Sequence, residues 1–132
     1  MKVYVTYQFK DANPDELREK LEELSKTLVE SAGWEPFIFF RDVQKWKKGA
    51  MSVQEIVDKA IESIKRCDAI LVEASEKARG AYFEVGYAKA LGKKVIVVHK
   101  KGTEAAFLEA TADIKIEYED LKDLGEKLKK LR

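Results

Sequence analysis

AILVEASEKARGAYFEVGYAKALGKKVIVVH, residues 69–99, is the stretch that decides the fold of this chain. It begins with an apolar run at residues 69–72 and ends with a second apolar run at residues 95–98. Between the two runs, residues 80–91 are a helix candidate that is stopped by Gly92. A strand, a helix and a strand in this order normally form two parallel strands with a right-handed crossover. The stretch therefore predicts one unit of a parallel sheet.

Glu84 is the unusual residue of the predicted helix, because it is the only charged residue between positions 81 and 88. At helical spacing it shares a face with Gly80, Ala88 and Leu91, where an isolated buried charge would be costly. It also lies just beyond the carboxyl end of a strand, where open α/β sheets bind their ligands. The pattern alone favours a functional carboxylate no more than a structural one that pairs with a lysine or lies at a subunit contact.

Outside this stretch the chain continues to alternate strands and helices. Strands are expected at residues 2–7, 35–40, 69–73, 94–98 and 114–118, and helices at residues 14–32, from residue 53 onward after the cap Ser52, at 80–91 and at 121–131, with a helical turn at 105–108. Pro36 suits an edge strand. Such alternation implies a parallel sheet covered on both faces. We predict one domain, residues 1–132, with an α/β three-layer sandwich and a parallel five-stranded sheet of the flavodoxin-like or Rossmann-like kind.

Composition limits the partners and the compartment. Hydrophobic residues make up 45% of the 132 residues, but no run is long enough to cross a membrane, and the first residues lack the apolar segment of a signal peptide. The single cysteine, Cys67, cannot form an internal disulfide, so we expect a cytoplasmic protein. Charged residues reach 37% with a net charge of +1, which gives no case for nucleic-acid or membrane partners. Abundant Lys and Glu, with few Cys and Met, indicate a thermophilic source.

Several motifs are missing from the sequence. It contains no GxGxxG after the first strand and no GxxxxGK[ST], and the single His99 and single Cys67 make no metal cluster. It also lacks GxSxG and a second histidine for a Ser-His-Asp triad. Carboxylates and tyrosines are therefore the side chains that could carry out nucleophilic or acid–base chemistry. We expect neither a metal nor a cofactor.

Polar side chains gather where the predicted strands end. Tyr7 and Gln8 follow the first strand, Asp42 follows the second and Ser75 follows the third. These positions converge over one crevice in a parallel sheet, and they suit a polar ligand that contains a ring. Tyr4, on one face of the first strand, could reach a neighbouring crossover helix, although core packing is the commoner role of such a tyrosine.

A carboxylate in such a crevice can attack an anomeric carbon and form a glycosyl-enzyme intermediate, which water or another acceptor then resolves. A tyrosine hydroxyl can hold that carboxylate in place. The sequence therefore permits, at Glu84, the chemistry of glycosidic-bond cleavage.

Residues 80–96, GAYFEVGYAKALGKKVI, resemble the signature of the nucleoside 2-deoxyribosyltransferase superfamily, which includes deoxynucleoside-monophosphate N-glycosidases. Residues 67–75 and 2–5 are similar to two further segments of that family. The resemblance implies that Glu84 is the nucleophile that cleaves an N-glycosidic bond and that Tyr4 orients it. It also implies a nucleoside or nucleotide substrate, no cofactor, and a homo-oligomer, a dimer or larger, in which neighbours complete the pocket. The residues expected to bind substrate are Tyr7, Gln8, Asp42, Ser75 and Gly80.

The chain departs from the family pattern at three places. The phosphate-binding members have a small Gly/Ser-rich loop after the first strand, whereas residues 6–9 here are the bulky TYQF. A family aspartate eight residues before the strand-three aspartate corresponds to Ala60, and a polar residue six before the nucleophile corresponds to Ala78. These departures keep a catalytically degenerate nucleotide-binding module open as an alternative.

A second resemblance competes with the first. Residues 5–11, VTYQFKD, and residues 41–61 are similar to the first two boxes of TIR-like domains, some of which cleave NAD while others form signalling assemblies. The EVGYA block at residues 84–88 favours the deoxyribosyltransferase side. We therefore predict cleavage of an N-glycosidic bond by hydrolysis or base exchange, with the TIR-like domain as the competing function.

Overall fold

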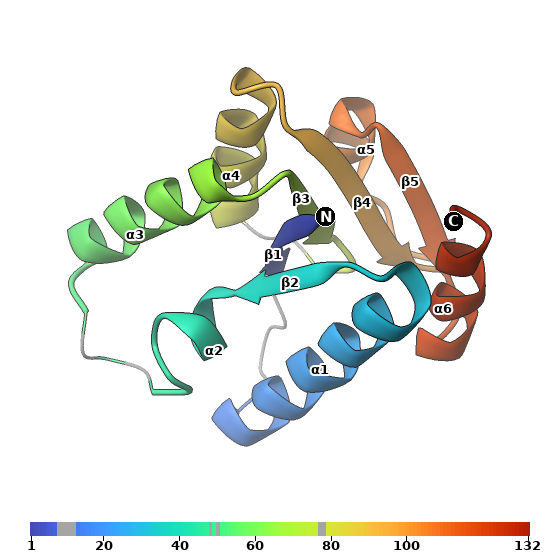
Figure 1. The fold of residues 1–132 in the computed structure, drawn as a ribbon, viewed down its shortest axis with the longest axis horizontal. Helices are drawn as coiled ribbons and strands as arrows, with labels where there is room; N and C mark the ends of the chain where they lie inside the picture. Colours follow the sequence, from blue (N-terminus) through green and yellow to red (C-terminus); the bar gives the residue numbers. More distant parts are fainter. Residues whose placement is uncertain (8–12, 48, 50, 77–78) are drawn as a thin grey trace.

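The computed structural model describes residues 1–7, 13–47, 49, 51–76 and 79–132 (Figure 1). Strands and helices alternate along the chain, as the sequence predicts. In chain order the elements are β1 (Lys2–Tyr7), α1 (Pro14–Thr27), the π-helix η1 (Leu28–Ala32), β2 (Glu35–Ile38), α2 (Phe39–Asp42), α3 (Val53–Arg66), β3 (Ala69–Glu73), α4 (Arg79–Ala90), β4 (Lys94–Lys100), α5 (Ala106–Thr111), β5 (Ile114–Tyr118) and α6 (Leu121–Lys129).

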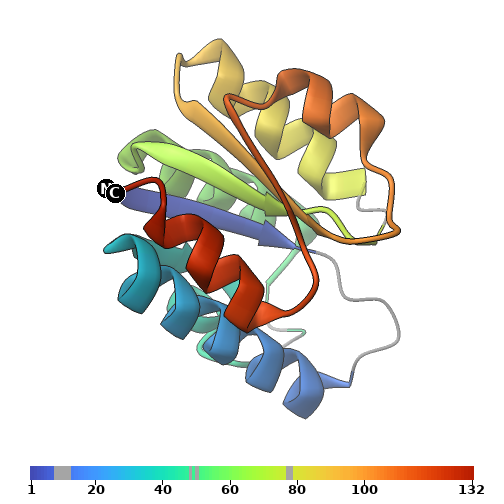
Figure 2. The same cartoon turned by 90° about the vertical axis from the view of Figure 1, so that its right-hand side faces the viewer.

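The described strands form one parallel sheet in the order β2-β1-β3-β4-β5. Figure 2 shows α1 and α6 on one face of the sheet and α4 and α5 on the other. This is the three-layer, flavodoxin-like sandwich predicted from the sequence. The chain moves outward in opposite directions from β1 and β3, so the switch point at which such sheets bind ligands lies between these two strands.

Two apolar clusters fill the space between the layers. Val3 and Val5 face α1 and α6, whereas Tyr4 faces the opposite cluster, because successive side chains of a strand alternate. On α4 the buried residues are Ala81, Val85 and Ala88. Their small side chains let α4 pack closely on β1 and β3, which brings the neighbouring Glu84 within reach of β1.

The helix starts follow the predicted caps. The Asn13 side chain accepts a hydrogen bond from the Glu16 backbone N–H before α1, where Pro14 takes the first helical position. Ser52 and Glu55 form a reciprocal capping box at the start of α3.

Two predicted strand ends were wrong, and one helix end was confirmed. The second strand ends at Ile38 rather than residue 40, because the Asp42 carboxylate accepts the Ile38 backbone N–H at 2.9 Å and the chain turns into α2. The first helix ends before Gly33 as predicted, although its last residues form the π-helix η1. β4 extends to Lys100, since β5 continues to pair with it there.

The structure also tests two predictions about single residues, Leu91 and Pro36. Leu91, expected on the same helix face as Glu84, is 43% exposed because it lies beyond the end of α4. β2 is an edge strand, which suits its Pro36.

Within the described part of the chain, no helix has both the length and the apolar character that a membrane span requires.

Candidate active site

The Glu84 carboxylate lies against β1 and is held there by two hydroxyl groups. The Tyr4 hydroxyl donates a hydrogen bond to Oε2 of Glu84, and the Thr6 hydroxyl donates to Oε1 at 2.7 Å. Tyr4 and Thr6 are two residues apart on a strand, so both side chains face α4. Each carboxylate oxygen therefore has a fixed donor, and the orientation of the carboxylate is set from two points.

A cavity of about 210 Å³ opens beside this carboxylate, next to the carboxyl end of β1. It lies at the switch point between β1 and β3, where ligands of open α/β sheets are bound. Its walls combine one carboxylate, three hydroxyl groups and an apolar side. The lining residues are Tyr4, Val5, Thr6, Tyr7, Phe39, Ile56, Ala60 and Glu84.

Burial shifts the protonation equilibria at this site. Burial raises the pKa of Glu84 above its usual value, and the hydrogen bonds from Tyr4 and Thr6 lower it in part. Burial, followed by the charge of Glu84, raises the pKa of Tyr4. Burial also raises the pKa of Tyr7 to about 12, against a hydrogen bond with the Phe40 backbone that lowers it. Both tyrosines therefore stay protonated at neutral pH and act as neutral hydrogen-bonding groups.

A model of a known enzyme family matches most of the chain. The model described as nucleoside 2-deoxyribosyltransferase matches residues 6–124 of the chain. The chain belongs to the nucleoside 2-deoxyribosyltransferase family. Membership indicates an enzyme of the deoxyribosyltransferase or N-glycosidase type, and it does not favour the TIR-like alternative.

Solved structures share the fold of this family member. A CMP N-glycosidase of Clostridium botulinum, BcmB, is 23% identical, with a TM-score of 0.70 and 100% of each chain covered. A 2-deoxyribosyltransferase of Bacillus psychrosaccharolyticus is 19% identical, with a TM-score of 0.65, over 97% of this chain and 96% of that one. A conserved protein of Enterococcus faecalis V583 is 13% identical, with a TM-score of 0.69, over 99% and 98%. No curated protein sequence matches the chain.

The structure brings together three of the residues that sequence reasoning assigned to the family site: Tyr4, Tyr7 and Glu84. Ala60, at the position of a family aspartate, lines the same cavity, so that wall is apolar here. Ala78 and Gln8, the latter predicted to bind substrate, lie outside the described residues.

The other predicted substrate contacts lie elsewhere. The Asp42 carboxylate accepts hydrogen bonds from the Arg41 guanidinium and from the Ile38 backbone, beside a different cavity at β2. Ser75 lines a larger cavity on the other face of the sheet. Gly80 is exposed in the first turn of α4 and lines none of these cavities.

Sequence reasoning missed four lining residues, Val5, Thr6, Phe39 and Ile56. Thr6 was recognisable, since it lies two residues after Tyr4 and must share its face of β1. Phe39 and Ile56 come from α2 and α3, and only the packing of those helices brings them to the cavity.

Proposed function

We propose that the chain cleaves the N-glycosidic bond of a nucleoside or nucleoside monophosphate, with Glu84 as the nucleophile. The observation that carries this proposal is a carboxylate held by two hydroxyl donors beside a cavity at the switch point of the sheet. The family match supports the class of reaction. Two proteins that share the fold, a CMP N-glycosidase and a 2-deoxyribosyltransferase, act on bonds of this kind by their names.

The reaction has two displacements at C1′ of the sugar. In the first, a Glu84 oxygen forms a bond to C1′ while the bond from C1′ to the base nitrogen breaks, and the base leaves with that electron pair and takes a proton from solvent. In the second, water or another base attacks C1′, the ester bond to Glu84 breaks, the carboxylate is restored, and the attacking group releases a proton to solvent. Water gives the free sugar, and a second base gives a new nucleoside, so hydrolysis and transfer differ only in the acceptor.

Tyr4 and Thr6 are positioning residues in this scheme. Their hydroxyls hold the two oxygens of Glu84, which reduces the motion that the carboxylate must lose on the way to the transition state. They also favour its ionised form, which is the form that attacks. Phe39 and Ile56 provide an apolar wall against which the flat ring of a base or one face of a sugar can pack.

We also propose that the active form is a homo-oligomer. Tyr82 and Phe83 on α4 are 51% and 47% exposed, and Phe107 on the contacting helix α5 is 81% exposed. Exposed aromatic side chains of this size are typical of contact surfaces. Because Tyr82 and Phe83 directly precede Glu84, a second copy on this surface would border the site.

The deciding experiment measures release of free base by chromatography. The panel contains deoxynucleosides, ribonucleosides, their 5′-monophosphates and NAD, with and without a second base as acceptor. Wild type is compared with Glu84→Gln and with Glu19→Gln, the same chemical change on the exposed face of α1. We expect release by wild type and Glu19→Gln, and none by Glu84→Gln.

Equal release by Glu84→Gln would remove Glu84 as the nucleophile. Release of base from NAD and from no other compound would favour the TIR-like function over the one proposed here. Absence of release from every compound would favour a binding module without turnover.

A further inference from the structure

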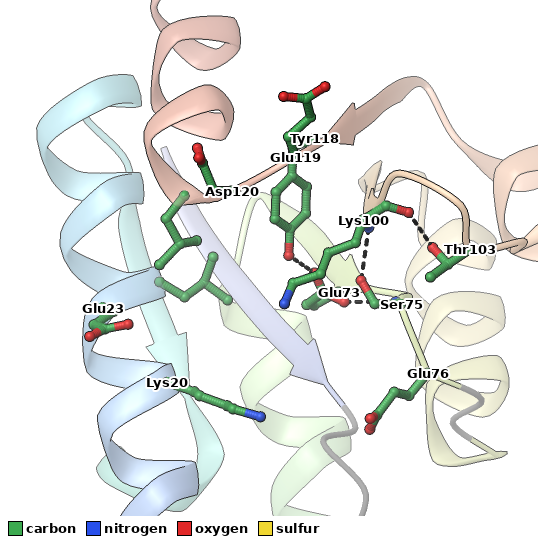
Figure 3. Close-up of a pocket in the computed structure, with 12 residues that line it drawn as sticks. Lys20, Glu23, Glu73, Ser75, Glu76, Lys100, Thr103, Tyr118, Glu119 and Asp120 are labelled. Carbon is green, nitrogen blue, oxygen red and sulfur yellow. Dashed lines mark hydrogen bonds between the residues drawn. The ribbon is translucent and has the colours of Figure 1, made fainter.

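Among the described residues, a tyrosine hydroxyl donates to a carboxylate on each face of the sheet, and the two carboxylates are fixed in different ways. On one face the Tyr118 hydroxyl donates to Glu73, and Figure 3 shows this pair beside Ser75. There the Ser75 backbone N–H also donates to Glu73, at 2.7 Å, so the main chain helps to fix the carboxylate. On the other face, the donors to Glu84 are side-chain hydroxyls of β1. The position of Glu84 therefore depends on how firmly those side chains are held.

The ring of Tyr4 is supported by a ring on the neighbouring strand. Phe37 of β2 is the register partner of Tyr4, and both side chains pack in the cluster between the sheet and α4. The two ring centroids are 5.8 Å apart and the ring planes differ by 18°, which is a stacked arrangement at a favourable separation. Phe37 therefore lies against the tyrosine whose hydroxyl holds Glu84.

Phe37 has a further contact that fixes its own ring. The Lys2 ammonium lies over this ring, 6.0 Å from the centroid, within the range of a cation–π contact. Lys2 lies two residues before Tyr4, so β1 contacts the Phe37 ring at two successive positions of the same face. A continuous series of contacts therefore leads from Lys2 through Phe37 and Tyr4 to Glu84.

Small motions of the Tyr4 ring matter because the hydroxyl is at its far end. A modest rotation about the first side-chain torsion moves this oxygen farther than any ring atom, and a hydrogen bond weakens steeply outside its narrow range of distance and angle. Phe37 itself lines the open cavity at β2, whereas Tyr4 lines the cavity beside Glu84. A substitution of Phe37 therefore alters the support of Tyr4 and leaves the lining of the Glu84 cavity unchanged.

We propose that Phe37 is a positioning residue, whose ring, stacked on Tyr4, keeps the Tyr4 hydroxyl on the Glu84 carboxylate. Its effect on reaction rate rests on the function proposed above for Glu84, whereas its effect on the hydrogen bond does not. The Tyr4 hydrogen bond lowers the pKa of Glu84. Loss of the Phe37 ring loosens this bond, so the pKa of Glu84 rises.

The surroundings of Glu84 make its ionisation a suitable measure of this bond. Tyr4 and Tyr7 are the titratable neighbours among the described residues that line its cavity, and both stay protonated at neutral pH. The walls from α2 and α3 are apolar, and α4 packs on apolar side chains of β3, β4 and α5. Besides burial, the groups that shift the pKa of Glu84 are the hydroxyls of Tyr4 and Thr6.

The test titrates Glu84 in the protein without substrate, by carbon NMR of its isotope-labelled carboxyl group, with the Glu84→Gln spectrum as the assignment. Phe37→Leu removes the ring and keeps an apolar side chain, and Phe37→Tyr keeps the ring. The control is Trp34→Leu, which removes a partly buried ring that lines the same cavity at β2 but packs on the opposite face of the sheet. Phe37→Leu is also made in the Tyr4→Phe background.

We expect Phe37→Leu to raise the pKa of Glu84 toward its value in Tyr4→Phe, while Phe37→Tyr and Trp34→Leu stay close to wild type. In the Tyr4→Phe background Phe37→Leu should add no further rise, because the hydroxyl through which Phe37 acts is absent. In base release, Phe37→Leu should lower kcat by about two- to tenfold, the factor that corresponds to one aromatic pair, with KM within about twofold of wild type.

Three results would overturn the proposal: an unchanged pKa of Glu84 in Phe37→Leu, an equal rise in Trp34→Leu, or an equal rise in the Tyr4→Phe background. If Phe37→Leu does not fold, Phe37→Ile removes the same ring with a β-branched side chain that suits a strand, and the same outcomes decide. A wild type that releases no base would contradict the proposed reaction only, since the NMR titration needs no turnover and still decides the role of Phe37.

Discussion

The hydroxyl of Tyr4 donates a hydrogen bond to the carboxylate of Glu84, and this bond joins the first strand of the sheet to the helix that follows the third. It brings together two residues that are 80 positions apart in the chain. The bond favours ionised Glu84, in opposition to burial, which favours the protonated form. The pH dependence of the reaction should therefore depend on Tyr4.

Tyr4→Phe should move the acid limb of the pH–rate profile to higher pH. In the proposed reaction, attack requires ionised Glu84, so activity falls as the pH drops through the pKa of Glu84, which burial raises above its usual value. Removing the Tyr4 hydroxyl removes one group that lowers this pKa, so the limb shifts upward. The measurement is kcat/KM for base release across pH, with Tyr87→Phe, on the same helix but outside the cavity, as the control. An unchanged acid limb would contradict a positioning role for Tyr4.

Thr6→Val should lower kcat by about tenfold or more, since a hydrogen bond to a charged group contributes about 1.5–3 kcal/mol. Valine keeps the shape of threonine but removes the hydroxyl that donates to Glu84. Thr6→Ser retains this donor and should recover most of the rate. The comparison uses steady-state kinetics together with the melting temperature of each variant. Equal losses in Val and Ser would show that packing, rather than the hydrogen bond, is the source of the effect.

Glu84→Gln should be more stable than wild type at neutral pH. The pKa of Glu84 is raised in the folded state, so the wild type loses stability as pH rises from the unfolded pKa of the carboxyl through its folded pKa. Glutamine does not ionise and avoids this loss. Melting temperatures measured from neutral pH down to about pH 4, near the unperturbed pKa of a carboxyl, should show the gap between the two proteins closing toward acid. A wild type that stays the more stable protein throughout would contradict the sign of this shift.

Sequence reasoning was accurate where periodicity and caps determine the structure. The parallel sheet, the caps at Asn13 and Ser52 and the family were all predicted, because they depend on local residue patterns. Phe39 was wrongly predicted to belong to β2. The reason is that the contact between Asp42 and the Ile38 backbone, which ends the strand, is not visible as a pattern.

The site predictions were likewise accurate where a sequence pattern encodes the contact, and wrong where the contact depends on the three-dimensional arrangement. Tyr4 and Glu84 were predicted as a pair from the family signature, and the structure places them in contact. Ser75 was expected in the same crevice because it follows β3, yet Glu73 and Ser75 open onto the opposite face of the sheet. Convergence at the carboxyl ends of strands does not specify the face, and the face decides which cavity a side chain enters.

Phe83→Ser and Phe107→Ser should reduce self-association. Both side chains are exposed on contacting helices, and a contact between copies would bury them. Size-exclusion chromatography with light scattering should show a smaller mass for these variants than for wild type at the same concentration. Leu131→Ser, which removes a half-exposed leucine near the carboxyl terminus, is the control and should keep the mass of wild type. A wild type that is already monomeric at high concentration would contradict the oligomer.

Tyr118→Phe should destabilise the fold, although it removes only one oxygen atom. The hydroxyl of Tyr118 is a donor to Glu73, whose carboxylate is 1% exposed and would be left with one missing partner. An unsatisfied buried group of this kind costs about 1–3 kcal/mol in the free energy of unfolding, more if it is charged. Urea unfolding at neutral pH measures this loss.

The Glu73→Gln background provides the control for this prediction. A neutral amide is less costly to leave partly unsatisfied than a carboxylate, so Tyr118→Phe should cost less there than in wild type. The difference between the two losses is the coupling between Tyr118 and Glu73. Equal losses in both backgrounds would assign the effect of Tyr118 to packing against Leu24 and its neighbours, because only the hydrogen bond depends on the charge of residue 73.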